Sequence, residues 1–115
     1  MIEYVSFGAT LPTGSYGAWT ELPLLLAGTR HGYYIEHDEA VLTGLSGFNS
    51  SGWADIRMTV NDRETIRIST SILESMGHLL ALRVLLRRGD RIRVFTTTSD
   101  DNMYVSAVVQ LQYRR

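Results

Sequence analysis

Side chains that bind metal ions or transfer protons cluster in two short stretches of this 115-residue chain. Glu36-His37-Asp38-Glu39 could suggest a metal site, and Asp100-Asp101-Asn102 a calcium loop. In an extended segment, however, Glu36 and Asp38 project to one side and His37 to the other, so they do not converge on one ion. The acidic loop offers about three oxygen ligands, whereas calcium takes six to eight. We therefore expect solvated loops at both places and neither a metal nor another cofactor.

The sequence also lacks the motifs of nucleophilic and phosphate chemistry. There is no cysteine, no serine in a nucleophile-elbow motif and no glycine-rich phosphate loop before a helix. Arg88-Gly89-Asp90 matches a tripeptide of some integrin ligands, but its place between two apolar stretches indicates a tight turn, in which glycine supplies unusual backbone angles. We expect the protein not to be an enzyme.

The composition predicts one globular domain over residues 1–115, because 44% of the residues are hydrophobic and the chain is long enough to bury a core. A net charge of −1 argues against general nucleic-acid binding, which needs a basic excess. The longest apolar run, Leu22 to Ala27, contains Pro23 and is too short to cross a membrane. All 11 basic residues are arginine, which indicates either a surface built for partners or genomic base composition.

The last third of the chain reads as three strands, 79–86, 91–98 and 103–113, in which apolar residues recur at every second position. Two further strands, 54–60 and 64–69, form a hairpin across Asn61-Asp62. The residues that this alternation predicts to face inward are Leu80, Leu82, Val84, Leu86, Ile92, Val94, Val105, Ala107, Val109, Leu111, Tyr113, Ile56, Met58, Val60, Ile66 and Ile68.

The first half is less regular. Residues 2–7 read as a strand, 40–45 as another, and 46–52 as a turn-rich loop. Met1 to Gly17, rich in glycine and serine toward its end, is a candidate flexible arm that contacts a partner or exchanges with a neighbouring copy. Segments 19–26 and 32–36 are short strands or irregular backbone, since Pro23 and two glycines interrupt them.

One helix-like segment, Ser71 to His78, is at most one or two turns long. About eight short strands with turns between them predict an all-β fold, an antiparallel β-sandwich with jelly-roll topology. An α/β fold would need crossover helices that the sequence does not contain.

Three segments resemble the small jelly rolls of the tumour necrosis factor and complement globular-head type, and the trimeric decoration, cement and fibre-tip domains of tailed-bacteriophage virions. They are Ala40 to Ser46, Ala54 to Asp62, and Leu82 to Val94 with its Gly89-Asp90 turn. The short N-terminal half and the lack of a signal segment favour the virion branch. The resemblance implies a homotrimer on the virion capsid surface, made in the host cytoplasm, with the major capsid protein as its partner and a decoration or cement function.

The outward faces of the late strands mix apolar, arginine and glutamine side chains, as subunit interfaces do. In the resembled families the sheet that holds the closing strands forms the trimer contact. The expected interface residues are Arg83, Leu85, Phe95, Tyr104, Val108, Gln110 and Gln112.

Aromatic residues of the first half support an alternative function, a receptor- or glycan-binding module of a phage tail fibre or similar surface protein. Its contact residues would be Trp19, Tyr33, Tyr34 and Trp53. The other interpretation is that these side chains fill the ends of the sandwich.

Overall fold

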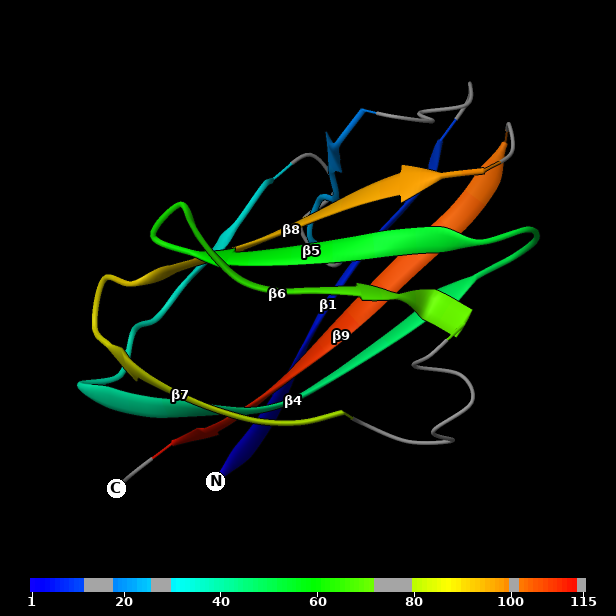
Figure 1. Ribbon diagram of the computed structural model, residues 1–115. Coiled ribbons are helices and arrows are strands. Elements are labelled where there is room, and N and C mark those ends of the chain that lie inside the picture. Colours follow the sequence, from blue (N-terminus) through cyan, green and yellow to red (C-terminus); the bar gives the residue numbers. More distant parts are fainter. Residues whose placement is uncertain (12–17, 26–29, 72–79, 100–101, 114–115) are drawn as a thin grey trace.

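A computed structural model describes residues 1–11, 18–25, 30–71, 80–99 and 102–113. In this part of the chain, two antiparallel sheets pack face to face and confirm the predicted all-β sandwich (Figure 1). The strands are β1 (Ile2–Leu11), β2 (Thr20–Glu21), β3 (Tyr33–Tyr34), β4 (Glu39–Asn49), β5 (Ala54–Val60), β6 (Arg63–Ser69), β7 (Leu80–Arg87), β8 (Arg91–Thr98) and β9 (Met103–Tyr113).

The first sheet has the order β1-β9-β4-β7, and the second has the order β2-β8-β5-β6 with β3 also paired to β8. The chain changes sheet between most successive strands. Four of the antiparallel pairs in the described residues are β1 with β9, β2 with β8, β4 with β7 and β5 with β6. These pairs are nested, so the two ends of the chain meet in one sheet. The backbone N–H of Tyr113 donates to the carbonyl of Met1 at 2.9 Å.

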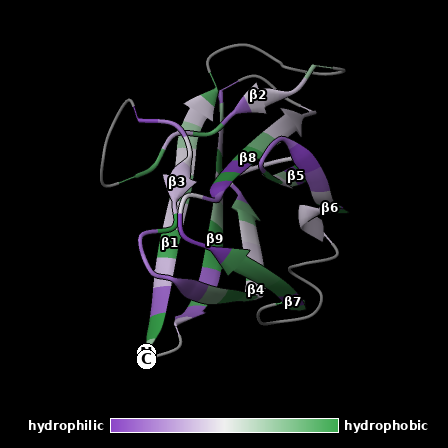
Figure 2. Cartoon of the chain, turned by 90° about the vertical axis from the view of Figure 1, so that its left-hand side faces the viewer, coloured by the Kyte–Doolittle hydropathy of each residue, from purple (hydrophilic) through white to green (hydrophobic). Residues whose placement is uncertain are grey.

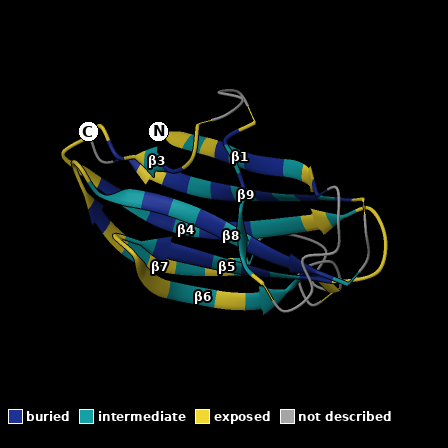
Figure 3. Cartoon of the chain, turned by 90° about the horizontal axis from the view of Figure 1, so that it is seen from above, coloured by how far each residue is buried: buried dark blue, intermediate teal, exposed yellow. Residues whose placement is uncertain are grey.

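Alternation along each strand produces the core between the sheets. Val105, Ala107, Val109 and Leu111 of β9 are fully buried, and the residues between them are more exposed. Along the strands this alternation appears as bands of hydropathy in Figure 2 and of burial in Figure 3. Apart from Val60, the predicted inward residues of β5, β8 and β9 are confirmed as core, and so is Leu86 of β7. The remaining predicted residues are partly buried and pack against this core: Val60, Ile66, Ile68, Leu80, Leu82 and Val84. The hydrophobic effect thus fixes both which face of each strand turns inward and how the sheets stack.

Turn chemistry confirms both predicted tight turns. Asn61 and Asp62 adopt φ values of 52° and 66°, the left-handed pair that a two-residue hairpin requires. Gly89 has φ of 91° between β7 and β8. The Asp90 carboxylate accepts hydrogen bonds from Asn61 Nδ2 at 2.9 Å and from the Arg87 N–H at 2.8 Å, and these bonds lower its pKa. Arg88-Gly89-Asp90 is therefore a structural turn.

The N-terminal segment differs from the predicted arm. Residues 2–11 are strand β1, paired with β9 from Ile2 opposite Gln112 to Leu11 opposite Met103. Phe7 in this strand is fully buried. The arm interpretation of residues 1–17 is therefore wrong for residues 2–11, because burial of alternate side chains holds them in the sheet. Residues 12–17 lie outside the described residues.

Strand β4 is longer than its predicted extent. The loop prediction for residues 46–49 is wrong, because β9 supplies pairing partners as far as Asn49 opposite Val105. The register of β4 against β9 shifts between Leu42 and Gly44, where a bulge adds one residue to β4. The prediction of short strands or irregular backbone is confirmed for residues 19–25 and 32–36, which contain only the two-residue strands β2 and β3. Residues 72–78, which make up most of the helix-like segment, lie outside the described residues.

Candidate functional site

The outer face of the first sheet, meaning the face turned away from the second sheet, carries six of the seven expected interface residues. Tyr104, Val108, Gln110 and Gln112 stand on β9, and Arg83 and Leu85 on β7. Each alternates with a residue that points into the core, so all six project outward.

Register shows how these side chains line up across the sheet. Ile2 is opposite Gln112, Gln112 is opposite Val41, and Val41 is opposite Leu85. One transverse row on the outer face therefore holds three apolar side chains and one amide. Leu85 is 71% exposed and lies on β7, an edge strand with β4 as its one strand neighbour among the described residues.

A second apolar group lies at the opposite end of the same face. Phe48 of β4 is 50% exposed, and its ring lies 6.4 Å from that of Tyr104. Tyr4 of β1 is also exposed, but it stands opposite Gln110 and is therefore next to the first row, one outward position from Ile2 and Gln112. The strands β1 and β4 thus add Ile2, Tyr4, Val41 and Phe48 to the predicted set. The period-two pattern of residues 2–7 could have identified Ile2 and Tyr4.

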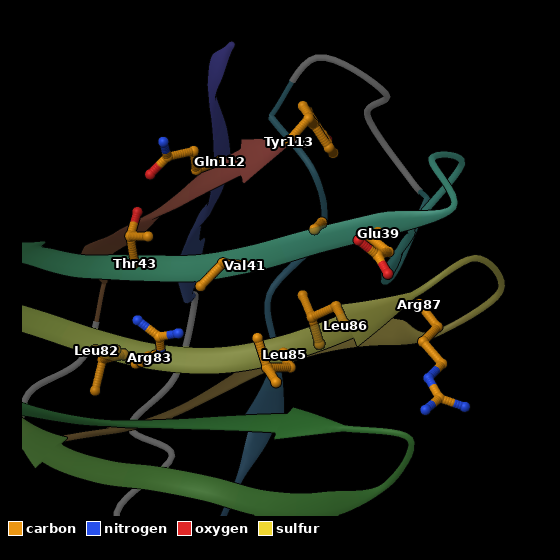
Figure 4. A pocket seen from close by; sticks show the side chains of 11 residues that line it. Glu39, Val41, Thr43, Leu82, Arg83, Leu85, Leu86, Arg87, Gln112 and Tyr113 are labelled. Atoms are coloured by element: carbon orange, nitrogen blue, oxygen red, sulfur yellow. The ribbon is translucent and has the colours of Figure 1, made fainter. Parts of the chain in front are cut away.

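A hollow of about 650 Å³ lies over β4, β7 and β9 at the end of this face (Figure 4). Val41 and Leu85 contribute apolar surface to it, and Arg83 and Arg87 line it with guanidinium groups. Arg83 makes no ion pair or hydrogen bond within the described part of the chain. The hollow therefore offers both apolar contact and hydrogen-bond donors to a side chain from another molecule.

Phe95 does not share this face. Strand β8 belongs to the second sheet, and the Phe95 ring lies there between the guanidinium groups of Arg57 and Arg93, at 4.7 and 4.9 Å. The prediction that groups Phe95 with the other six residues is therefore wrong. Alternation shows which side of its own strand a residue faces, but it does not show which sheet that strand joins.

The four aromatic residues of the glycan alternative are not gathered on one surface. Tyr33 and Tyr34 pair with Ile92 and Arg91 at the start of β8, whereas Trp53 accepts a backbone bond from Ser99, just past the end of β8. These ends are separated by roughly 20 Å, the length of β8 at about 3.3 Å per residue. Trp19 lies elsewhere again, over the middle of the second sheet beside Arg57 and Arg67.

Tyr33 instead belongs to a polar cluster that closes one end of the sandwich. The hydroxyls of Tyr33 and Tyr113 both donate to the Glu3 carboxylate, and the His37 ring stacks on Tyr113 with centroids 3.8 Å apart. Burial raises the pKa of both hydroxyls, and their bonds to Glu3 add to the rise. Both phenols thus remain protonated donors at neutral pH, which suits a structural clasp between β1, β3 and β9 and not a catalytic base.

Neither a metal-binding cluster nor a membrane-spanning helix occurs among the residues that the structure describes. These residues hold no cluster of three or more His, Asp or Glu side chains that could bind a metal ion. They also include no helix long and apolar enough to span a bilayer. His78, Asp100 and Asp101 lie outside them. No known family model and no curated protein sequence matches the chain.

Proposed function

We propose that this protein is a non-enzymatic structural protein, which forms a homotrimer through the outer face of the first sheet and decorates a virus capsid. The observation that carries the proposal is the apolar character of that face. Ile2, Tyr4, Phe48 and Leu85 are all at least half exposed there in the single chain. Exposed apolar side chains on one sheet face are typical of an interaction surface.

The size of the face is sufficient for association. Four strands about 4.8 Å apart and about ten residues long cover roughly 600 Å² in projection. In a cyclic trimer each copy shares this face between two neighbours, so the three contacts together would bury roughly 1,800 Å², an area within the range of stable protein interfaces. Side-chain relief increases this area, so a copy of the same chain is a partner of adequate size.

Two further features favour a closed assembly of identical copies. β7 and β6 are open edges of their sheets, and cyclic association protects an edge such as β7 from uncontrolled strand pairing. The nested strand pairs support the inference of a jelly-roll topology, in which the first and last strands are neighbours. The number of three copies, the virion location and the capsid partner come from the resemblance to phage decoration proteins.

The mechanism of decoration would be mass action. A rigid trimer seated where capsid subunits meet adds contact area to the assembled shell and none to free subunits, so its binding free energy stabilises the shell. Three identical contacts made at once would raise the avidity well above the affinity of a single copy. The major capsid protein is the expected partner.

The test is co-sedimentation of the purified protein with empty expanded capsids of a tailed phage that encodes the chain, beside host cell-wall polysaccharide. We expect binding to capsids that saturates at a fixed number of trimers per shell. The Leu85→Asp variant should bind more weakly, because a monomer loses avidity. Binding to the polysaccharide but not to capsids would refute decoration and support the glycan-binding alternative.

A further inference from the structure

The outer face of the second sheet carries an alternating stack of arginine and aromatic side chains, here called the arginine ladder. Its members, in spatial order, are Arg67, Trp19, Arg57, Phe95 and Arg93. Each guanidinium carbon lies between 4.7 and 5.2 Å from the centre of a neighbouring ring. Such distances allow cation–π attraction at every step.

Strand pairing positions the ladder. Arg57 of β5 is directly opposite Arg67 of β6 on one side and opposite Phe95 of β8 on the other. Trp19 immediately precedes β2, which pairs with β8 at Thr20 opposite Thr96. The indole is thereby held over the two arginines from outside the sheet.

The three arginines of the ladder differ in whether a neighbouring carboxylate neutralises them. Arg93 donates to Glu21 at 2.9 Å and to Asp62 at 2.8 Å, and Arg67 donates to Glu64 at 2.7 Å. Arg57 makes no ion pair or hydrogen bond within the described residues, and its Nε is buried without a partner.

Arg57 also faces Arg67 directly across the strands. Glu64 offsets the charge of Arg67, and no carboxylate of the described residues pairs with Arg57. The terminal nitrogens of Arg57 are not among the buried unpaired atoms, so they are open to a ligand. A planar guanidinium edge of this kind matches an oxyanion in a two-point hydrogen bond.

The rings and carboxylates around Arg57 determine which kind of anion could bind there. Arg57 already packs between the Trp19 and Phe95 rings, which leaves less ring surface for stacking against a sugar. Carboxylates on the same face, including Glu21, Asp62 and Glu64, repel a polyanion such as nucleic acid. A single negative charge on an otherwise neutral surface needs no free ring surface, and these carboxylates repel it less than they repel a polyanion.

We propose that Arg57, framed by Trp19 and Phe95, is a binding site for the carboxylate of an aspartate or glutamate side chain on a partner protein. The partner would offer an isolated acidic residue on a flat surface, since the ladder lies on a sheet face. This site is on the sheet opposite to the proposed self-association face, so each proposal stands or fails independently of the other.

The test is a titration followed by NMR at the Arg57 Nε–H and the Trp19 indole N–H. The probe is N-acetyl-aspartate methylamide, and its asparagine analogue is the neutral control. We expect saturable shifts of both signals with the aspartate compound only. Equal shifts with the asparagine analogue would overturn the proposal, and tighter binding of inorganic phosphate than of the aspartate compound would overturn the assignment to a carboxylate.

Variants distinguish specific binding at Arg57 from a general attraction of the anion to positive charge. Arg57→Gln should weaken binding about tenfold or more, in line with the loss of a charge-assisted hydrogen bond. Arg63→Gln, which removes the same charge from an exposed position at the start of β6, should leave binding unchanged. Arg57→Lys keeps the charge but loses the planar fork, and it serves if Arg57→Gln does not fold; it should bind several-fold more weakly than the parent. Unchanged affinity in a folded Arg57 variant would refute the site.

Discussion

Replacing Leu85 by aspartate is the sharpest test of association through the first sheet. Leu85 is 71% exposed in the single chain. Full burial of a leucine side chain contributes about 1.5–3 kcal/mol, so covering the exposed part would contribute about 1–2 kcal/mol per copy. Three copies give about 3–6 kcal/mol, a factor of about 10² to 10⁴ in the association constant of a trimer. Burying the new carboxylate adds a desolvation cost, so this range is a lower bound.

The assay is light scattering coupled to size exclusion over a concentration series. Because a trimer constant depends on concentration squared, half-assembly should move to roughly 10 to 100 times higher protein concentration. The folded monomer should change little, by about 0.5 kcal/mol in its free energy of unfolding, since the site is exposed. Ser51→Asp adds the same charge to an exposed loop between β4 and β5 and should leave assembly unchanged. A parent protein that stays monomeric across this range, or a Leu85→Asp variant that assembles like it, would refute the reasoning.

Three further predictions concern the fold, and chemical denaturation measures all of them. Phe7→Ala should cost about 3–5 kcal/mol of unfolding free energy, because Phe7 is fully buried in β1; a loss near zero would restore the interpretation of this segment as an arm. Gly89→Ala should cost about 1–2 kcal/mol although no atom lies within 4 Å of the added carbon, because φ is +91° there; a neutral result would contradict the strain argument. The hydrogen bond from Arg93 lowers the pKa of Glu21 below 4.5, so its stabilisation is present above about that pH and is lost as the pH falls through the lowered value. Glu21→Gln should flatten this part of the acid-stability profile, and identical profiles for the variant and the parent would exclude the contribution.

Period-two alternation predicts the late strands well because it acts within one strand. It identifies Ile92, Val105 and Leu111 as core, and the residue types at Asn61-Asp62 and Gly89 predict their turns through local backbone angles. Pairing between distant strands is not encoded in this local pattern.

The mistaken grouping of Phe95 with Leu85 follows from that difference, since β7 and β8 are consecutive strands in different sheets. For the same reason, the arginine ladder could not be predicted from the sequence. Arg57 and Phe95 become neighbours only through the register of β5 and β8. The extent of β1 and β4 was likewise set by the length of their shared partner β9 and not by their own composition.

The two outer faces of the sandwich differ in how the chain itself covers them. On the second sheet, Thr59 and Thr97 alternate with core residues and so point away from the core, yet they are only 5% and 8% exposed because other parts of the chain cover them. On the first sheet, the outward residues Phe48 and Leu85 remain 50% and 71% exposed. A chain that shields one sheet with its own side chains and leaves apolar groups uncovered on the other gains more from association through the uncovered one. The same comparison favours recognition of a single charge on the second sheet, because Thr59 and Thr97 are covered there and Arg57 has no ion pair among the described residues.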